Sequence, residues 1–279
     1  MKIAVTGGKG GTGKSTIATA LAYYLSQNNK VTLIDADVEC PNDSIIMGAE
    51  EIDHKQVHQF IPKFDMKKCN HCGQCSKNCK EHAIIVTKEK LIFFPEQCTG
   101  CQVCMYVCPE KAISKDEKTI GEIKTYKANT NLTIKAGILK PGIEESANIV
   151  KELVKETDNN DKFTIIDTAA GTHCDVIKSL IPSDEVLAVT EPTPLGLNDL
   201  KLIIKVVKEL KKTVGVVINK YGLSEEYQNK IRDFCNKEEI EIIGRVYYDE
   251  EIIKQYISGK PIIREEIKEI GEHYEGKSC

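Results

Sequence analysis

The run GGKGGTGKST at residues 7–16 decides the fold of this chain. It matches the pattern G-x-x-x-x-G-K-[ST] from Gly8 to Ser15. A short apolar segment precedes it at residues 2–6, and a stretch with helical apolar spacing follows at residues 15–25. Glycines let backbone N–H groups turn inward, and a helix N-terminus adds positive potential. The run therefore predicts a phosphate-binding loop between a strand and a helix.

This loop is the predicted ATP site. Lys14 is expected to reach the β- and γ-phosphates, and Ser15 to ligate Mg²⁺. A chance glycine turn is the alternative, but spacing and flanking segments both fit the motif. The candidate nucleotide-binding residues are Gly8, Lys9, Gly10, Gly11, Thr12, Gly13, Lys14, Ser15 and Thr16.

A second lysine, Lys9, stands in the same loop. GKGGTGKST resembles the deviant Walker A loop of the MinD/ParA/Mrp ATPases, a superfamily that includes the nitrogenase iron protein. In that family the early lysine reaches across a dimer to the partner's nucleotide, so the resemblance implies a catalytic role in trans for Lys9. It also implies a homodimer, or a heterodimer with a paralogous ATPase. The alternative is an ordinary solvated loop lysine.

Two aspartates follow the second expected strand, in the segment DADVECPN at residues 35–42. This segment resembles the family's D-x-D-x-x-x-P-N sequence. The resemblance implies that Asp37 orients the attacking water and that Asp35 lies near the Mg²⁺ ion. Capping of a strand end is the alternative for both residues.

Later segments extend the resemblance. DTAAG at residues 167–171 implies that Asp167 holds Mg²⁺ through water and that Gly171 faces the γ-phosphate. The family usually has proline before that glycine, where this chain has Ala170. Asn219 matches the family's adenine-reading asparagine, and Tyr247 replaces a proline in a segment that lines the base.

Apolar strands alternate with helical stretches along most of the chain. Such alternation predicts an α/β P-loop fold with a mostly parallel sheet and helices on both faces. A helix is expected at Leu197–Lys211. The expected strands are Ile3–Thr6, Val31–Ile34, Phe163–Ile166, Glu185–Thr190 and Val214–Asn219.

Eight of the 12 cysteines form two runs, CNHCGQCSKNC at residues 69–79 and CTGCQVCMYVC at residues 98–108. Each reads C-x-x-C-x-x-C-x-x-x-C, as in two-cluster bacterial ferredoxins, where the fourth cysteine of each run ligates the other cluster. Zinc is the alternative, but zinc sites commonly use pairs of C-x-x-C. We predict one [4Fe–4S] cluster on Cys69, Cys72, Cys75 and Cys108, and a second on Cys98, Cys101, Cys104 and Cys79.

The cysteine runs also define the expected domains. CKEHAIIV after the first run parallels CPEKAISK after the second, so the block is an internal repeat, with Lys80 where proline is usual. We expect an ATPase domain in two parts, 1–62 and 117–279. A small inserted α+β domain of ferredoxin type is expected at 63–116.

Cys174 lies seven residues after Asp167. In the nitrogenase iron protein, a cysteine at that spacing ligates a cluster shared between subunits. The resemblance thus marks Cys174 as a candidate ligand for a further cluster at a dimer interface. An inert, buried cysteine is the alternative.

The family resemblance implies ATP-driven dimer closure, and the cysteine-rich insertion implies electron transfer. The first hypothesis is an ATPase that gates electron transfer through its clusters to a partner redox protein or metallocofactor. The alternative is a carrier that hands a cluster or metal to an apo-metalloprotein. The net charge of −4 disfavours a nucleic-acid partner, and no apolar stretch suggests a membrane partner. Clustered cysteines fit metal binding in the cytoplasm.

Overall fold

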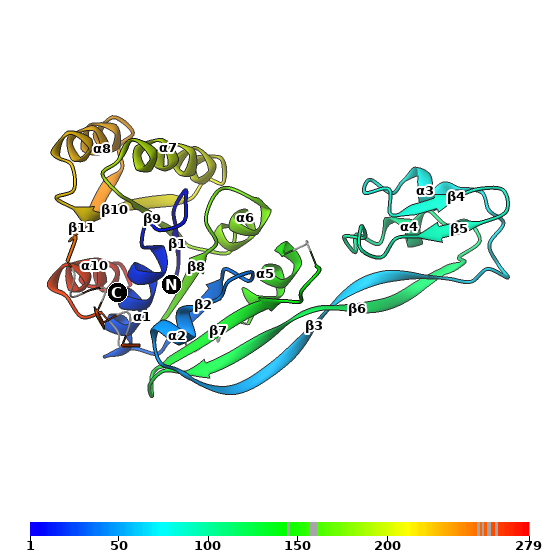
Figure 1. The fold of residues 1–279 in the computed structure, drawn as a ribbon, viewed down its shortest axis with the longest axis horizontal. Coiled ribbons are helices and arrows are strands. Elements are labelled where there is room, and N and C mark those ends of the chain that lie inside the picture. The colour runs from blue at the N-terminus through cyan, green and yellow to red at the C-terminus, as the bar shows by residue number, and fades with distance from the viewer. Residues whose placement is uncertain are drawn as a thin grey trace. The chain divides into compact units, whose positions relative to one another are not determined.

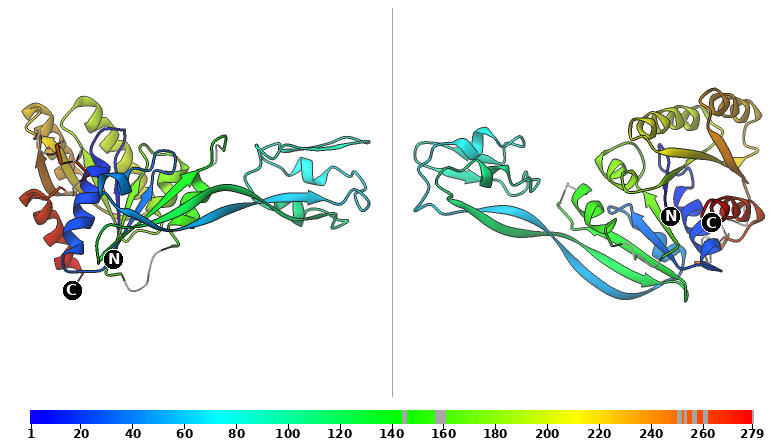
Figure 2. Two further views of the ribbon diagram at one scale, coloured as in Figure 1. Left: turned by 60° about the horizontal axis from the view of Figure 1, so that its bottom comes forward. Right: turned by 180° about the vertical axis from the view of Figure 1, so that it is seen from behind.

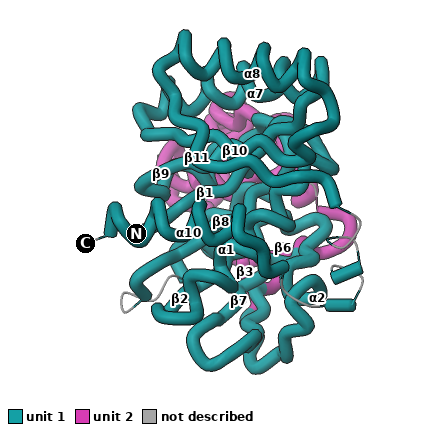
Figure 3. Tube along the Cα trace, turned by 90° about the vertical axis from the view of Figure 1, so that its left-hand side faces the viewer, with its two compact units in different colours: residues 1–55, 123–138, 146–279 teal, residues 56–122, 139–145 magenta. Residues whose placement is uncertain are grey.

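The computed structural model divides the chain into two compact units (Figure 3). Unit 1 comprises residues 1–55, 123–138 and 146–279, and unit 2 comprises residues 56–122 and 139–145. The structure describes residues 1–143, 146–156, 161–249, 252, 254–255, 258–259 and 262–278.

The elements are labelled in Figure 1. The strands are β1 (Lys2–Thr6), β2 (Val31–Ala36), β3 (Glu50–Phe64), β4 (Ile84–Val86), β5 (Leu91–Phe93), β6 (Ile113–Lys127), β7 (Leu132–Leu139), β8 (Phe163–Thr168), β9 (Glu185–Thr190), β10 (Thr213–Tyr221) and β11 (Glu241–Tyr247). The helices are α1 (Lys14–Ser26), α2 (Asp43–Ile46), α3 (Gln74–Lys77), α4 (Val103–Tyr106), α5 (Ala147–Leu153), α6 (Cys174–Leu180), α7 (Pro194–Glu209), α8 (Glu225–Lys237) and α10 (Glu265–Lys277).

One sheet, in the order β11-β10-β9-β1-β8-β2-β7-β6-β3, organises the described residues. Its strands from β11 to β7 pair in parallel. The central strands are buried along their whole length, because helices cover both faces of the sheet. Figure 2 shows these helices from two further sides. Parallel pairing places the carboxyl ends of β1, β2, β8, β9 and β10 along one edge, where ligands bind in such sheets.

The apolar core of unit 1 packs its helices against the sheet. Helix α1 places Ile17, Leu21 and Leu25 at helical spacing, and all three are fully buried against the sheet. Helix α10 packs beside it and buries Tyr274 completely. Helix α7 begins where the Thr193 hydroxyl accepts the Gly196 N–H at 3.0 Å, a cap that fixes the helix start.

Unit 2 is much smaller. Its β4 and β5 pair antiparallel, with Ile84 opposite Phe93, and α3 and α4 are single turns. Its main cluster of buried apolar residues contains Phe60, Ile84, Cys104 and Ile113. So small a core supplies little stabilisation by itself.

The predicted fold class is confirmed as an α/β fold with a mostly parallel sheet. Each expected strand of the sheet is present, and the helix expected at 197–211 is α7, which starts three residues earlier. The long strands β3 and β6 were not expected. Most of the β3 side chains before Val57 are polar and exposed, so they show no apolar alternation. Unit 2 accordingly starts at residue 56, earlier than the expected boundary at 63.

Among the described residues, no helix combines the length and apolar character needed to cross a bilayer.

Candidate functional site

The glycine-rich loop joins β1 to α1. Gly13 caps α1 with a left-handed φ of 88°, and a Cβ there would stand 2.1 Å from the Asn219 amide nitrogen. A Cβ on Gly8 would meet Asp199 at 2.1 Å. Side chains at these two positions would push the loop outward, so glycine is required for the close turn.

Lys14 is the buried lysine of this loop. Its side chain is 7% exposed, and its Nζ donates to the Lys9 carbonyl at 3.2 Å. Burial lowers the pKa of Lys14, while the carboxylates of Asp167 and Asp37 raise it in opposition. A desolvated ammonium on the first turn of α1 interacts strongly with any anion placed at the helix N-terminus.

Three buried carboxylates lie at the ends of β2 and β8. Asp35 and Asp167 are register partners, and Asp43 follows on α2. Asp35 accepts N–H groups from Asn42 at 2.8 Å and from Asp43 at 3.0 Å. One Asp167 oxygen and both Asp43 oxygens have no partner among the described residues.

The electrostatics of this acidic group favour a cation. Burial, with neighbouring carboxylates, raises the pKa of Asp167 to about 8 and that of Asp43 well above its usual range. Burial also raises the pKa of Asp35, to about 6. Ser15 donates a hydrogen bond to Asp167. A hydroxyl beside unpartnered carboxylate oxygens is a donor set that Mg²⁺ prefers.

Asp37 stands apart from the three buried carboxylates. It is half-buried, and burial raises its pKa above the usual range. The charges of Lys14 and Asp175 act on it in opposite directions. The structure thus places Asp37 within electrostatic range of Lys14, beyond the end of β2.

Lys9 is paired within its own chain. Its Nζ lies 2.8 Å from one oxygen of Glu191, and Lys220 lies 2.8 Å from the other. Burial would raise the pKa of Glu191, but hydrogen bonds from Lys220 and Lys9 outweigh it and lower the pKa. Lys220 also donates to the Gly11 carbonyl at 2.8 Å. The buried Glu191 therefore connects the glycine-rich loop, through Lys9, with the end of β10, through Lys220.

A cavity of about 510 Å³ opens beside the loop. Its lining includes Ser15, Thr16, Asn42, Asn219 and Tyr247. Asn219 is buried and its Nδ2 donates to the Thr12 carbonyl at 2.8 Å. The volume lies within the range of small-ligand sites.

Gly171 and Cys174 follow β8. Gly171 has φ of 97°, and its N–H donates to the Gly7 carbonyl at 3.2 Å, so the predicted switch glycine touches the glycine-rich loop. Cys174 begins α6 and is exposed. The alternative of a buried cysteine is therefore wrong for this residue.

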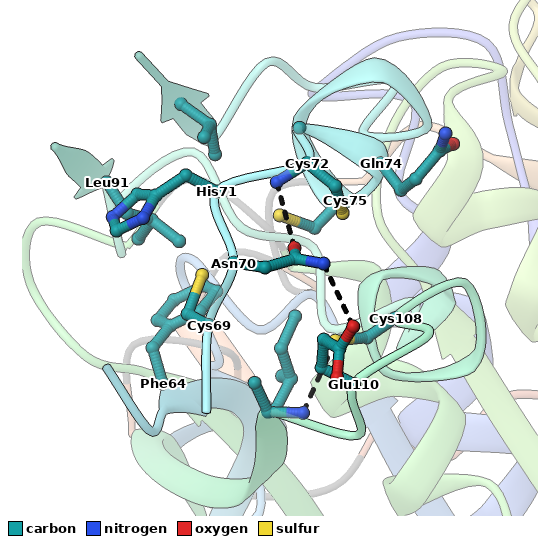
Figure 4. A pocket seen from close by; sticks show the side chains of 14 residues that line it. Phe64, Cys69, Asn70, His71, Cys72, Gln74, Cys75, Leu91, Cys108 and Glu110 are labelled. Carbon is teal, nitrogen blue, oxygen red and sulfur yellow. Dashed lines mark hydrogen bonds between the residues drawn. The ribbon is translucent and has the colours of Figure 1, made fainter. Parts of the chain in front are cut away.

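In unit 2 the cysteines line two pockets. The first contains Cys69, Cys72, Cys75 and Cys108 (Figure 4), and the second contains Cys79, Cys98, Cys101 and Cys104. Each pocket combines three cysteines of one run with the last cysteine of the other. The volume of the first pocket is about 20 Å³ and that of the second about 360 Å³, so the first pocket is much smaller.

The thiols of these pockets influence one another. Burial and the nearby Cys98 raise the pKa of Cys104 to about 11. Burial also raises the pKa of Cys75, with Cys69 and Cys108 adding to the effect. Among the described residues, however, no group of three or more His, Cys, Asp or Glu side chains has the arrangement of a metal site. The pockets thus gather the cysteines without forming a metal site.

The model of the CobQ/CobB/MinD/ParA nucleotide-binding domain matches residues 3–262. This chain belongs to that family. It is a nucleotide-binding ATPase of MinD/ParA type, and the predicted P-loop ATPase is confirmed at that level.

Relatives cover nearly the whole chain. An uncharacterized protein of Methanocaldococcus jannaschii is 37% identical over 266 residues, 95% of this chain and 92% of that protein. The septum site-determining protein MinD of Thermotoga maritima is 24% identical over 280 residues, 98% of this chain and 84% of MinD.

Two solved structures share the fold. MinD of Pyrococcus horikoshii OT3, complexed with Mg-ADP, superposes with a TM-score of 0.62 at 19% identity, covering 100% of this chain and 98% of MinD. The cell division ATPase MinD of Pyrococcus furiosus gives 0.61 at 19% identity, covering 99% and 98%. At this identity the likeness establishes the fold alone.

Sequence reasoning missed three residues of this MinD/ParA-type site, namely Glu191, Lys220 and Asp43. Each lies within or directly after a strand or motif that the sequence predicts. Glu191 follows β9, and Lys220 follows Asn219 in β10. A charged residue at the carboxyl end of a buried parallel strand, or just beyond it, is the signal that would have found the first two.

Replacing Lys14 with alanine should weaken ATP binding by about 10- to 100-fold, since a charge-assisted contact to phosphate is lost. Equilibrium titration with a fluorescent ATP analogue measures the effect. Lys9→Ala is the matched control, because it removes the other lysine of the loop. Equal affinity losses in the two variants would contradict the distinct roles assigned to them.

Proposed function

We propose that this chain is an ATPase whose nucleotide-driven dimer closure gates electron transfer through two [4Fe–4S] clusters to a partner redox protein or metallocofactor. One observation carries the electron-transfer part: each pocket of unit 2 gathers four cysteines, and each draws one of them from the other run. Zinc sites built from local C-x-x-C pairs need no such exchange.

The chemistry of the donor sets supports this proposal, although the thiols are not arranged as a metal site. Each pocket offers four thiols amid apolar side chains, among them Phe64 and Val86 in the first and Phe60 and Phe93 in the second. Burial is the main cause of the raised pKa values of Cys75 and Cys104, and the neighbouring thiols add to it. The first pocket must widen to admit a cluster. Bound clusters would supply one-electron redox chemistry, and we propose residues 63–116 as the module that holds them.

On the ATPase side, the roles follow from charge and position. Lys14 neutralises the β- and γ-phosphates, and Ser15, Asp35 and Asp167 are the residues that would hold Mg²⁺. Asp37 orients the attacking water. Lys9 leaves Glu191 on dimer closure and reaches the partner's phosphates. Gly171 reports the state of the γ-phosphate from the end of β8.

Cluster delivery is the second candidate, and ligand exposure favours it. Cys72 and Cys101 are exposed, so an acceptor could reach one ligand in each pocket. In that case the recipient is an apo-metalloprotein. The exposed thiol of Cys174 is a candidate ligand for a further cluster shared between two subunits.

One anaerobic experiment separates the two functions. Iron-loaded protein is reduced, mixed with ATP and either a one-electron acceptor dye or an iron chelator, and followed by absorbance. Electron gating predicts ATP-dependent dye reduction with iron retained on the chain. ATP-dependent loss of iron to the chelator, with no change in dye reduction, would favour delivery. No effect of ATP on either readout would contradict both.

A further inference from the structure

The backbone and the side chain of Lys9 contact different parts of unit 1. Its carbonyl accepts the Lys14 ammonium at 3.2 Å, within the glycine-rich loop. Its own ammonium lies 2.8 Å from Glu191, which follows β9. The Lys9 side chain is 33% exposed, whereas that of Glu191 is only 8% exposed. Because a lysine side chain is long and flexible, Lys9 can turn away from Glu191 while the loop keeps its shape.

Glu191 itself is held in place by the start of α7. Its carbonyl accepts the Thr193 N–H at 2.8 Å, and a Cβ on Gly196 would lie 2.2 Å from the same oxygen, so the first turn of α7 packs closely on the Glu191 backbone. The Thr193 hydroxyl also donates to the Glu191 carboxylate at 3.3 Å. Any change in the contact between Lys9 and Glu191 must therefore come from Lys9.

Lys220 is the second cation on this carboxylate. Its ammonium lies 2.8 Å from the other Glu191 oxygen and also donates to the Gly11 carbonyl at 2.8 Å. A buried carboxylate without a cationic partner is strongly unfavourable. Since Lys220 remains bonded to Glu191, the departure of Lys9 breaks one ion pair but does not leave the buried charge uncompensated. The contact with Lys9 can thus be broken at moderate cost.

We propose that Glu191 is a positioning residue that holds Lys9 away from phosphate in the single chain, so that closure of a dimer must break two such contacts. The inference rests on the proposed function, because it takes Lys9 to act on the phosphates of a second copy. The Glu191 carboxylate accepts from both lysines at once, one on each oxygen, and competes with phosphate for Lys9. Glu191 therefore lowers the affinity of one ATP-bound chain for another.

Sedimentation equilibrium of the full chain, with Mg²⁺ and a non-hydrolysable ATP analogue, measures the dimer dissociation constant. Glu191→Gln preserves the size of the side chain but leaves one acceptor oxygen, which cannot serve both lysines. The constant should fall by about tenfold, since each of the two partly exposed ion pairs contributes about threefold. Glu238→Gln is the matched control, because it breaks the ion pair with Lys208 outside the nucleotide cavity, and its constant should equal that of the unaltered chain.

A double variant shows whether Glu191 acts through Lys9. Lys9→Ala should dimerise more weakly than the unaltered chain, and Glu191→Gln/Lys9→Ala should match Lys9→Ala alone. The inference is refuted if Glu191→Gln tightens the dimer equally with and without Lys9, or does not tighten it although the unaltered chain dimerises. A Glu191→Gln chain that does not fold would show a structural role for the carboxylate and refute it too. An unaltered chain that stays monomeric with the analogue would instead overturn the proposed function.

Discussion

Replacing Lys9 with alanine should slow ATP hydrolysis by about 10³-fold or somewhat less, while single chains still bind ATP nearly as before. The structure gives the reason for this split. Lys9 bonds through its side chain to Glu191 rather than pointing at its own loop, and Lys14 is the lysine buried at the start of α1. A cation that reaches the partner's phosphates acts only in the closed dimer, where exclusion of water strengthens it. Steady-state phosphate release measures the loss.

Mixed dimers decide whether Lys9 acts in trans. Lys9→Ala chains are mixed with Asp37→Ala chains, each inactive alone. In a mixed dimer, the site on the Lys9→Ala chain keeps its own Asp37 and receives Lys9 from its neighbour. Activity should return as the two chains are combined. If mixed dimers form and remain inactive at every ratio, Lys9 acts within its own chain or not at all.

Anaerobically purified protein should contain about eight irons per chain, and removing cysteines in chosen pairs should reveal which cysteines share a cluster. The pockets predict that Cys69 and Cys108 belong together. The double variant Cys69→Ala/Cys108→Ala should therefore keep about four irons, because the second pocket is intact. Cys69→Ala/Cys79→Ala damages both pockets and should keep far fewer.

The control for these pairs is Cys40→Ala, an exposed cysteine of unit 1 that lies outside both pockets. Its iron content should equal that of the unaltered chain. The reverse result for the two double variants would show that each run holds its own cluster. Zinc with little iron in the unaltered chain would contradict the clusters altogether.

Much of the fold was predictable because buried parallel strands leave a strong local signal. Segments such as FTIIDT are apolar throughout, and the glycine-rich loop has a fixed spacing. Strand β3 was not predictable, since its exposed polar residues are held by pairing within the sheet rather than by their own pattern.

The candidate site was likewise predictable only in part. Lys14 starts the helix after the glycine-rich loop, Asp35 and Asp167 stand at strand ends, and the structure brings all three together. The pairing of Lys9 with Glu191 joins residues 182 positions apart, a contact that no local pattern contains.

Asp43 has a consequence for attempts to engineer this protein. Its carboxyl group is fully buried, and neither oxygen has a hydrogen-bond partner among the described residues. Replacing such a group with an apolar one of similar size recovers roughly 1–3 kcal/mol. Any screen for heat-tolerant variants would therefore select changes at Asp43 early. The same changes would remove one carboxyl group from the acidic group that favours a cation, so the more stable variants would be poorer ATPases.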